Sequence, residues 1–176
     1  LGYVGCVTAA CLAKNGHEVI GIDKNKQKVD LINNGKPTIM EKGLEEIVAQ
    51  AVAEKKLRAT TNAEDGVINS KISLICVGTP SNSNGSLYLN YVKRVCKEIG
   101  NALARKKDFH VVAIRSTILP GITENILIPI LEKCSKKVVF KDFGVCVNPE
   151  FMREGNSVYD FYNPSRIIIG TPDKRS

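Results

Sequence analysis

The sequence lacks long apolar runs and any visible export signal. None of its hydrophobic stretches approaches the roughly 20 residues that a membrane-spanning helix needs. Its N-terminus has no basic segment followed by an apolar one, as a secretory signal would require. These absences predict a cytoplasmic protein with no membrane segment.

The six cysteines also lack a metal-binding pattern, because they form no CxxC pair and no Cys/His cluster. Most lie inside apolar runs, where a free thiol behaves as a small buried hydrophobic group. We therefore expect reduced thiols, with no metal site and no disulfide framework, at Cys6, Cys11, Cys76, Cys96, Cys134 and Cys146.

The net charge of +7 is not arranged as in a nucleic-acid-binding protein. The lysines are scattered, as at Lys55 and Lys56, and no basic stripe is interleaved with aromatic residues that would stack on bases. We interpret this charge as a solvated surface that mildly attracts anionic ligands, and expect no nucleic-acid partner.

Short apolar runs alternate with helical patterns along all 176 residues. Continuous apolar runs of this length are typical of strands buried on both faces of a parallel sheet. The pattern predicts one α/β domain with a doubly wound parallel sheet of the Rossmann type. The expected strands are Glu18–Asp23, Ile72–Val77, His110–Ile114, Phe143–Val147 and Arg166–Gly170.

Between these runs, three sets of apolar residues recur at helical spacing. Asn90 is the expected N-cap of the second helix, and Pro129 is expected to bend or shorten the third. The three predicted faces are Leu44, Ile47, Val48, Ala51 and Val52; Val92, Val95, Cys96, Ile99 and Leu103; and Ile122, Ile126 and Ile130.

A glycine turn opens the chain. Gly2 and Gly5 match the second and third glycines of a GxGxxG fingerprint, which allows a pyrophosphate to approach the backbone at a helix N-terminus. Asp23 ends the next expected strand, where an acid accepts hydrogen bonds from an adenosine ribose and disfavours a 2′-phosphate. Turn, helix and acid together predict NAD binding, although Asp23 also suits a helix cap.

This register leaves the strand before Leu1 outside the sequence. We therefore expect a Rossmann domain over residues 1–176 that lacks its first, central strand and is truncated at both ends. Such a fragment is expected to be poorly stable alone.

Three further motifs follow expected strands, at the sheet edge where ligands of this fold bind. Two of them, Val77–Pro80 and Arg115–Gly121, place the hydroxyls of Thr79 and Thr117 at that edge. The third, Asn148–Gly155, contains two carboxylates and a guanidinium, which fit either a binding site or a surface ion pair between Arg153 and a neighbouring glutamate.

Taken together, these motifs resemble the NAD-binding domain of the UDP-glucose/GDP-mannose dehydrogenase family over essentially the whole chain. The resemblance rests on Gly2–Gly5, Gly21–Asp23 with Lys28, Val77–Pro80, Ser116-Thr117 with Pro120-Gly121, and Asn148–Gly155. It implies an enzyme that oxidises the C6 alcohol of a nucleotide sugar to a carboxylate with two NAD⁺, through a cysteine-bound thiohemiacetal and thioester.

The resemblance also implies roles for individual residues. Thr117 and Glu150 would be catalytic, and Glu150 with Phe151 and Glu154 would bind substrate. The implied cofactor-binding residues are Gly2, Tyr3, Val4, Gly5, Asp23, Lys28, Thr79, Thr117 and Glu154.

The nucleophilic Cys motif of the family has no match in this chain. We therefore expect activity in a full-length parent and not in this fragment alone. The full-length protein is expected to be a homodimer or larger homo-oligomer. Residues Asn148–Gly170 look more like UDP-glucose dehydrogenases, so UDP-glucose is the expected substrate. Residues Thr79–Ile99 look equally like the GDP-mannose enzymes, so GDP-mannose is the alternative. Two other readings remain open: a β-hydroxyacid dehydrogenase and a stand-alone, non-catalytic nucleotide-binding module.

Overall fold

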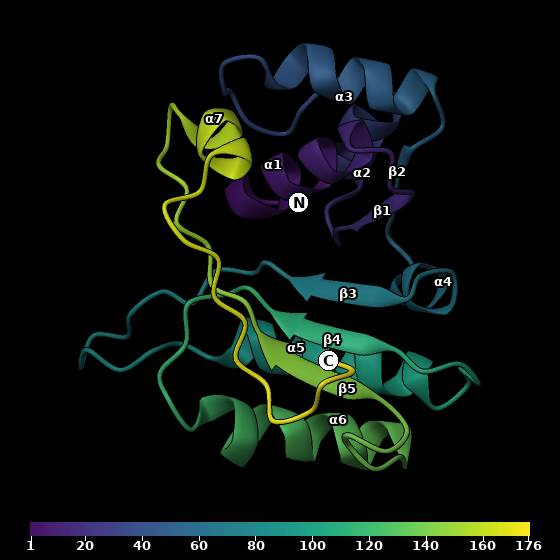
Figure 1. Ribbon diagram of the computed structural model, residues 1–176, viewed down its shortest axis with the longest axis vertical. Coiled ribbons are helices and arrows are strands. Elements are labelled where there is room, and N and C mark those ends of the chain that lie inside the picture. The colour runs from purple at the N-terminus through teal and green to yellow at the C-terminus, as the bar shows by residue number, and fades with distance from the viewer. The chain divides into compact units, whose positions relative to one another are not determined.

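The computed structural model describes all residues, 1–176, and their contacts divide them into two compact units. The first unit contains Leu1–Asn62 and Glu150–Ile167, and the second contains Ala63–Pro149 and Ile168–Ser176. Each unit has its own parallel sheet and its own hydrophobic core (Figure 1). No helix is both long enough and apolar enough to cross a bilayer.

The first unit packs helices around a two-stranded parallel sheet, in which Val19 lies opposite Leu57. Helix α1 is almost entirely small and apolar, and its fully buried Val7, Ala10 and Cys11 belong to the core of this unit. These small side chains let neighbouring elements approach closely, which is why α1 contacts α3, β1 and α7. The elements are α1 (Tyr3–Lys14), β1 (Val19–Ile22), α2 (Lys26–Asn33), α3 (Leu44–Ala53), β2 (Leu57–Thr60) and α7 (Ser157–Tyr162).

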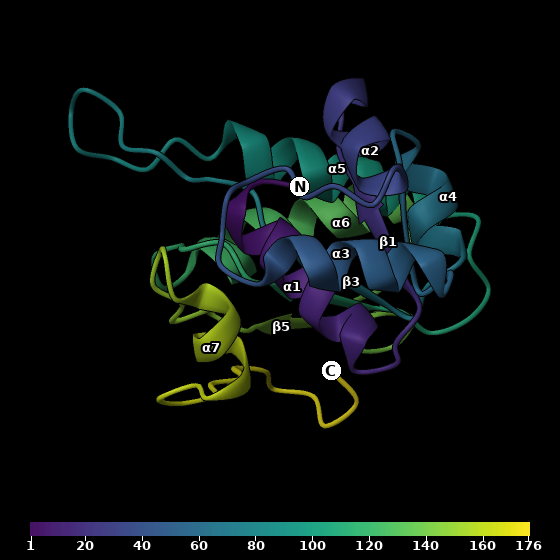
Figure 2. The same ribbon diagram turned by 90° about the horizontal axis from the view of Figure 1, so that it is seen from above.

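The second unit is a three-stranded parallel sheet in the order β3-β4-β5, with α5 and α6 packed against each other. Its core includes Val112, Ile114, Leu127 and Phe143, none of which is exposed. A polar segment between β3 and α5 extends away from the rest of this unit (Figure 2). The elements are α4 (Ala63–Ile68), β3 (Ile72–Ile75), α5 (Asn90–Leu103), β4 (Val111–Ile114), the π-helix η1 (Thr123–Leu127), α6 (Ile128–Ser135) and β5 (Gly144–Val147).

The expected α/β architecture with parallel strands is confirmed, and four of the five expected strands are present with shorter bounds. The fifth, Arg166–Gly170, was wrong. This segment makes only an isolated antiparallel bridge between Gly170 and Val147, and Ile167 is 74% exposed. The sequence analysis missed β2, whose Leu57 and Ala59 are buried while Arg58 is exposed.

Strands β4 and β5 are mostly buried, whereas β1 and β3 are less so. In β4 three consecutive residues are buried, as expected for an interior strand. Strands β1 and β3 each pair with a single strand, and each keeps a substantially exposed isoleucine, Ile22 and Ile72. The expectation of burial on both faces therefore fails for β1 and β3.

The expected helical faces are mostly correct, but two details differ. Asn90 is not the N-cap of α5: Leu89 holds that position, and no side chain caps the helix. Pro129 does mark a change of helix type, because η1 ends at Leu127 and α6 begins at Ile128. Proline has no N–H to continue the hydrogen-bond ladder, which explains a π-type turn just before it.

The third predicted face was displaced by one position along the helix. Ile122, Ile126 and Ile130 are only partly buried, whereas Leu127 and Leu131 are fully buried. The π-turn changes the number of residues per turn, so a spacing argument that assumes a regular α-helix selects the wrong residues here.

Candidate functional site

The first turn of α1 is open to an anion. Gly2 is the N-cap, no side chain caps the helix, and no acidic residue lies in its first turn. The first intrahelical bond runs from the Cys6 N–H to the Gly2 carbonyl at 2.8 Å, so the N–H groups of the preceding residues, Val4 and Gly5 among them, have no partner in the helix. A Cβ added at Gly2 would meet no atom within 4 Å, which leaves room for a phosphate beside the backbone.

Asp23 lies directly after β1. Its Oδ1 accepts a hydrogen bond from the Asn25 N–H at 2.9 Å, and its Oδ2 lies 2.5 Å from the Leu1 ammonium. Burial alone would raise the pKa of Asp23, but the Leu1 ammonium, the Asn25 N–H and the charge of Lys28 together hold it below its ordinary value. Asp23 is therefore a carboxylate near Lys28. The N-cap of α2 is Asn25 and not Asp23, although Asp23 accepts the N–H of that cap residue.

The Tyr3 hydroxyl connects α1 with the last segment of the same unit. It donates a hydrogen bond to Glu41, lies 3.1 Å from the Ser157 hydroxyl, and accepts a hydrogen bond from the Gly155 N–H at 3.1 Å. Glu41 follows α2 in the loop that leads to α3. Tyr3 is thus brought beside the glycine that directly follows Glu154.

The segment that begins at Glu150 is a compact turn. Glu150 Oε2 accepts a hydrogen bond from the Met152 N–H at 2.7 Å, which turns this carboxylate back onto its own backbone. Phe151 is 42% exposed, and the Arg166 guanidinium lies 5.4 Å from the centre of its ring. Glu154 is exposed, so its carboxylate is accessible to a ligand.

Arg153 forms the ion pair that one interpretation of this motif expected, but with a different acid. Its Nε and Nη2 contact the Asp160 carboxylate at 3.0 and 2.8 Å, and its backbone N–H donates to the same group at 2.9 Å. The partner is in α7 and is neither Glu150 nor Glu154. Arg153 therefore closes the turn and leaves both glutamates unpaired with it.

In the second unit, hydroxyl groups join the ends of β3 and β4. The Thr79 hydroxyl donates to the Thr117 carbonyl at 2.6 Å, and the Ser116 hydroxyl lies 2.6 Å from the Val77 carbonyl. The expected placement of both threonines at one sheet edge is therefore observed. The Thr117 side chain is exposed, whereas Ser116 is buried and has a structural contact.

Two residues of the expected motifs, for which no individual role was predicted, also join strand ends in this unit. The Arg115 guanidinium donates to the Asn148 side-chain oxygen at 2.6 Å, and the Asn148 amide donates to the Ile168 carbonyl at 2.9 Å. Asn148 also donates its backbone N–H to the Ile114 carbonyl at 2.9 Å. Asn148 thus fixes the exit of β5 beside the end of β4.

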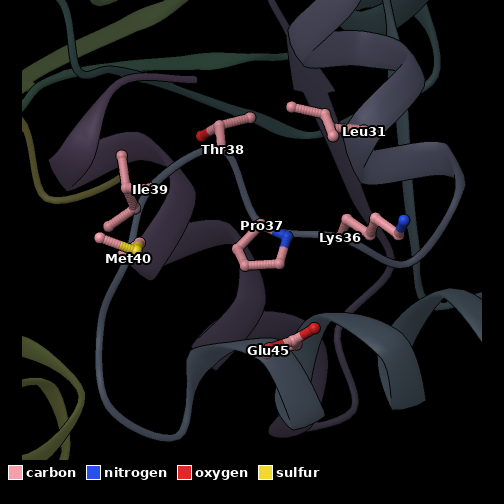
Figure 3. A pocket seen from close by; sticks show the side chains of 7 residues that line it. All are labelled: Leu31, Lys36, Pro37, Thr38, Ile39, Met40 and Glu45. Atoms are coloured by element: carbon pink, nitrogen blue, oxygen red, sulfur yellow. The ribbon is translucent and has the colours of Figure 1, made fainter.

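The loop between α2 and α3 forms a shallow hollow on the first unit (Figure 3). None of the expected cofactor- or substrate-binding residues lines it. The Thr38 hydroxyl in this loop donates to the Leu1 carbonyl at 2.9 Å, which ties the loop to the residue before the glycine turn. The lining residues are Leu31, Lys36, Pro37, Thr38, Ile39, Met40 and Glu45.

An uncapped helix N-terminus with an open glycine, followed by an acid at the end of the next strand, is the binding arrangement of dinucleotide-binding α/β proteins. The particular family follows from comparison with known proteins. All of residues 1–176 match the model of the UDP-glucose/GDP-mannose dehydrogenase family, NAD binding domain, and the chain belongs to this family.

Three relatives show the range of similarity. The GDP-mannose 6-dehydrogenase of Pseudomonas syringae pv. syringae is 50% identical over 176 residues, which are 100% of this chain and 40% of that protein. A crystal structure of a ternary complex of GDP-mannose dehydrogenase from Pseudomonas aeruginosa matches with a TM-score of 0.98 and 48% identity, over 99% of this chain and 40% of the other. A UDP-glucose dehydrogenase structure from Pyrobaculum islandicum matches with a TM-score of 0.93 and 38% identity, with the same coverage of 99% and 40%.

The chain therefore spans about 40% of the length of these relatives and corresponds to their NAD-binding domain. The residues at the glycine turn and at Asp23 fit a dinucleotide, because free N–H groups and open space could accept its phosphates and a carboxylate could accept hydrogen bonds from its ribose.

Proposed function

We propose that the complete protein is an NAD-dependent GDP-mannose 6-dehydrogenase, which oxidises the C6 alcohol of its sugar to a carboxylate. The observation that carries this proposal is the 50% identity to a GDP-mannose 6-dehydrogenase across the whole chain, against 37% to the UDP-glucose 6-dehydrogenase of Haloferax volcanii. This order reverses the preference for UDP-glucose that the sequence motifs suggested. UDP-glucose becomes the second candidate substrate.

The cofactor roles follow the geometry of each unit. The open backbone of Gly2–Gly5 would bind the pyrophosphate, and Tyr3 and Val4 would lie along it. Asp23 and Lys28 would hold the adenosine ribose, because Asp23 directly follows β1, where a carboxylate accepts hydrogen bonds from the ribose hydroxyls. Thr79 and Thr117 would contact the nicotinamide half. When bound, NAD⁺ supplies the hydride acceptor.

The substrate roles fall on the turn after β5. Glu150, Phe151 and Glu154 would contact the nucleotide sugar, and Glu150 would position water or stabilise charge beside the reacting carbon. The exposed carboxylate of Glu154 supports this role, because Arg153 pairs with Asp160 and leaves Glu154 available.

We place the nucleophilic cysteine of the reaction outside residues 1–176. Burial raises the pKa of the Cys11 thiol to about 11 and that of Cys96 to about 12, and burial also raises the pKa of Cys146. A thiol with a pKa of about 11 or 12, as at Cys11 and Cys96, contains almost no thiolate at neutral pH, and the thiolate is the nucleophile. These cysteines act as core residues.

The test is an assay of the complete protein with NAD⁺, in which GDP-mannose and UDP-glucose are compared at equal concentrations and NADH formation is followed. We expect the higher kcat/KM with GDP-mannose and two NADH per sugar consumed. A higher kcat/KM with UDP-glucose would select the second candidate. NAD⁺ binding without NADH formation from either sugar would contradict the enzymatic function and favour a nucleotide-binding module.

A further inference from the structure

The Glu41 carboxylate is the centre of a hydrogen-bond network inside the first unit. Glu41 Oε2 accepts hydrogen bonds from the Tyr3 hydroxyl and from the Gly155 N–H, the latter at 2.9 Å. Glu41 Oε1 accepts a third from the Ser157 N–H at 3.2 Å. One side chain thus contacts the first residue of α1 and the turn that leads into α7.

The charges in this network favour an ionised Glu41. Burial alone would raise the pKa of Glu41, but the hydrogen bonds from Tyr3, Gly155 and Ser157 outweigh it and hold the pKa below its ordinary value. Burial, followed by the hydrogen bond to Glu41, raises the pKa of the Tyr3 hydroxyl. A carboxylate that accepts several N–H and O–H groups forms charge-assisted bonds, which are the stronger kind of hydrogen bond.

Glu41 lies on a loop that other contacts hold in place. The loop that carries it is itself fixed by the bond from Thr38 to the Leu1 carbonyl and by its entry into α3. Gly155 has a positive φ of 81° and is exposed, and it lies in the turn that Arg153 and Asp160 close. Glu41 therefore links a fixed loop to the residue directly after Glu154.

We propose that Glu41 is a positioning residue, which holds Glu154 in register with the first turn of α1 through Tyr3, Gly155 and Ser157. This inference rests on the proposed function, in which α1 meets the cofactor pyrophosphate and Glu154 meets cofactor and substrate. The role of Glu41 is to keep the two binding segments of this unit at a constant separation.

The test uses the complete protein in four forms: wild type, Glu41→Gln, Tyr3→Phe and the double variant. Glutamine keeps the size of Glu41, but its amide group cannot accept a hydrogen bond where the carboxylate accepts one now. For each form, the Kd for NAD⁺ is measured by calorimetry, kcat and KM are measured with GDP-mannose, and Tm is measured by thermal unfolding. Glu46→Gln, an exposed acid in the first turn of α3, is the matched control.

We expect Glu41→Gln to raise the Kd for NAD⁺ and to lower kcat/KM by about tenfold each, because a hydrogen-bonded charge is lost. Since Tyr3 and Glu41 act as one unit, the double variant should differ from Glu41→Gln by no more than about twofold. Glu46→Gln should stay within about twofold of wild type.

Two results would overturn the inference. The first is a lower Tm for Glu41→Gln with Kd and kcat/KM unchanged, which would make Glu41 a purely structural contact. The second is a double variant in which the fold-changes of the two single variants multiply, which would show that Tyr3 and Glu41 act independently. Wild-type protein that binds NAD⁺ but forms no NADH would contradict only the proposed function, since the Kd values still test Glu41. Wild-type protein that binds no NAD⁺ would overturn both.

Discussion

At the scale of single residues, the ion pair of Arg153 was one of the two interpretations of its motif, but its partner, Asp160, was not predicted. The sequence placed Arg153 among acids and left open an ion pair with a neighbouring glutamate. The actual partner is seven residues away in α7, where Asp160 accepts three hydrogen bonds from Arg153. Sequence spacing did not indicate α7, because this helix has only six residues and a weak apolar pattern.

This pair makes stability depend on pH in a defined direction. The Arg153 guanidinium and backbone N–H lower the pKa of Asp160 from 3.8 to about 2. A carboxyl group whose pKa is lower in the folded than in the unfolded protein stabilises the fold at pH values above its unfolded pKa. This stabilisation is lost as the pH falls through its folded pKa. Asp160→Asn should therefore be less stable than wild type at neutral pH, and the difference should narrow between pH 3.8 and about pH 2.

Urea unfolding of the complete protein across this pH range measures the effect. Asp30→Asn, which removes only an exposed pair with Lys26, is the control and should have little effect at any pH. A difference between Asp160→Asn and wild type that does not change with pH would show that the charge of Asp160 contributes nothing.

Glu41 was missed for a different reason. No helical or strand periodicity covers its loop, and a single acid between Pro37 and Gly43 looks like an ordinary surface residue. Its three donors come from residues 38, 114 and 116 positions away, so only the folded chain shows them together. By contrast, Gly2, Asp23, Thr79 and Thr117 were predictable because each follows a strand or begins a helix, and the fold determines where such positions lie.

At the scale of elements, the buried strands and the longer helices were predictable from apolar pattern alone. The errors occur where burial is incomplete. Strand β2 alternates Leu-Arg-Ala-Thr and lies at an edge, so it has no continuous apolar run. Residues 166–170 have such a run, but their isoleucines are exposed and form no ladder. Hydrophobicity therefore indicated a strand without showing whether another strand pairs with it.

The contact between α5 and α6 depends on Gly100. A Cβ at this position would lie 2.7 Å from the Cys134 Cβ and 3.1 Å from the Leu131 carbonyl oxygen. A glycine-to-alanine change in a helix normally adds about 1 kcal/mol of stability. Overpacking of a well-packed contact costs about 1–3 kcal/mol, so we expect Gly100→Ala to lower the free energy of unfolding overall.

The measurement is urea unfolding of the complete protein, with the exposed neighbour Asn101→Ala as the control. Asn101→Ala should be neutral or slightly stabilising, because only helix propensity changes there. If Gly100→Ala were as stable as this control, the two helices would not be as closely packed as described.

At the scale of the whole molecule, the chain is a dinucleotide-binding α/β protein of the UDP-glucose/GDP-mannose dehydrogenase family. Its net charge of +7 is in keeping with anionic ligands, which is how the sequence was interpreted. The class of protein and the cofactor were predictable, because both depend on short motifs at strand ends. The sugar was not, because most of the residues that would recognise it are expected outside this chain.

Binding of the cofactor pyrophosphate at the open glycine of α1 is the central feature of the proposed function. Gly2 has a φ of −79° and free space around a Cβ, so other residues fit its backbone, and replacing this N-cap costs about 1 kcal/mol of stability. Alanine and valine lose the cap equally, and they differ in how far they fill the space proposed for the pyrophosphate. The measurement is the Kd for NAD⁺ of the complete protein as wild type, Gly2→Ala and Gly2→Val. We expect the Kd for NAD⁺ to rise from wild type to Gly2→Ala and further to Gly2→Val, where the rise reaches about tenfold or more. The two variants should have a similar Tm. An unchanged Kd for Gly2→Val would contradict pyrophosphate binding at this glycine, and would place NAD⁺ away from the start of α1.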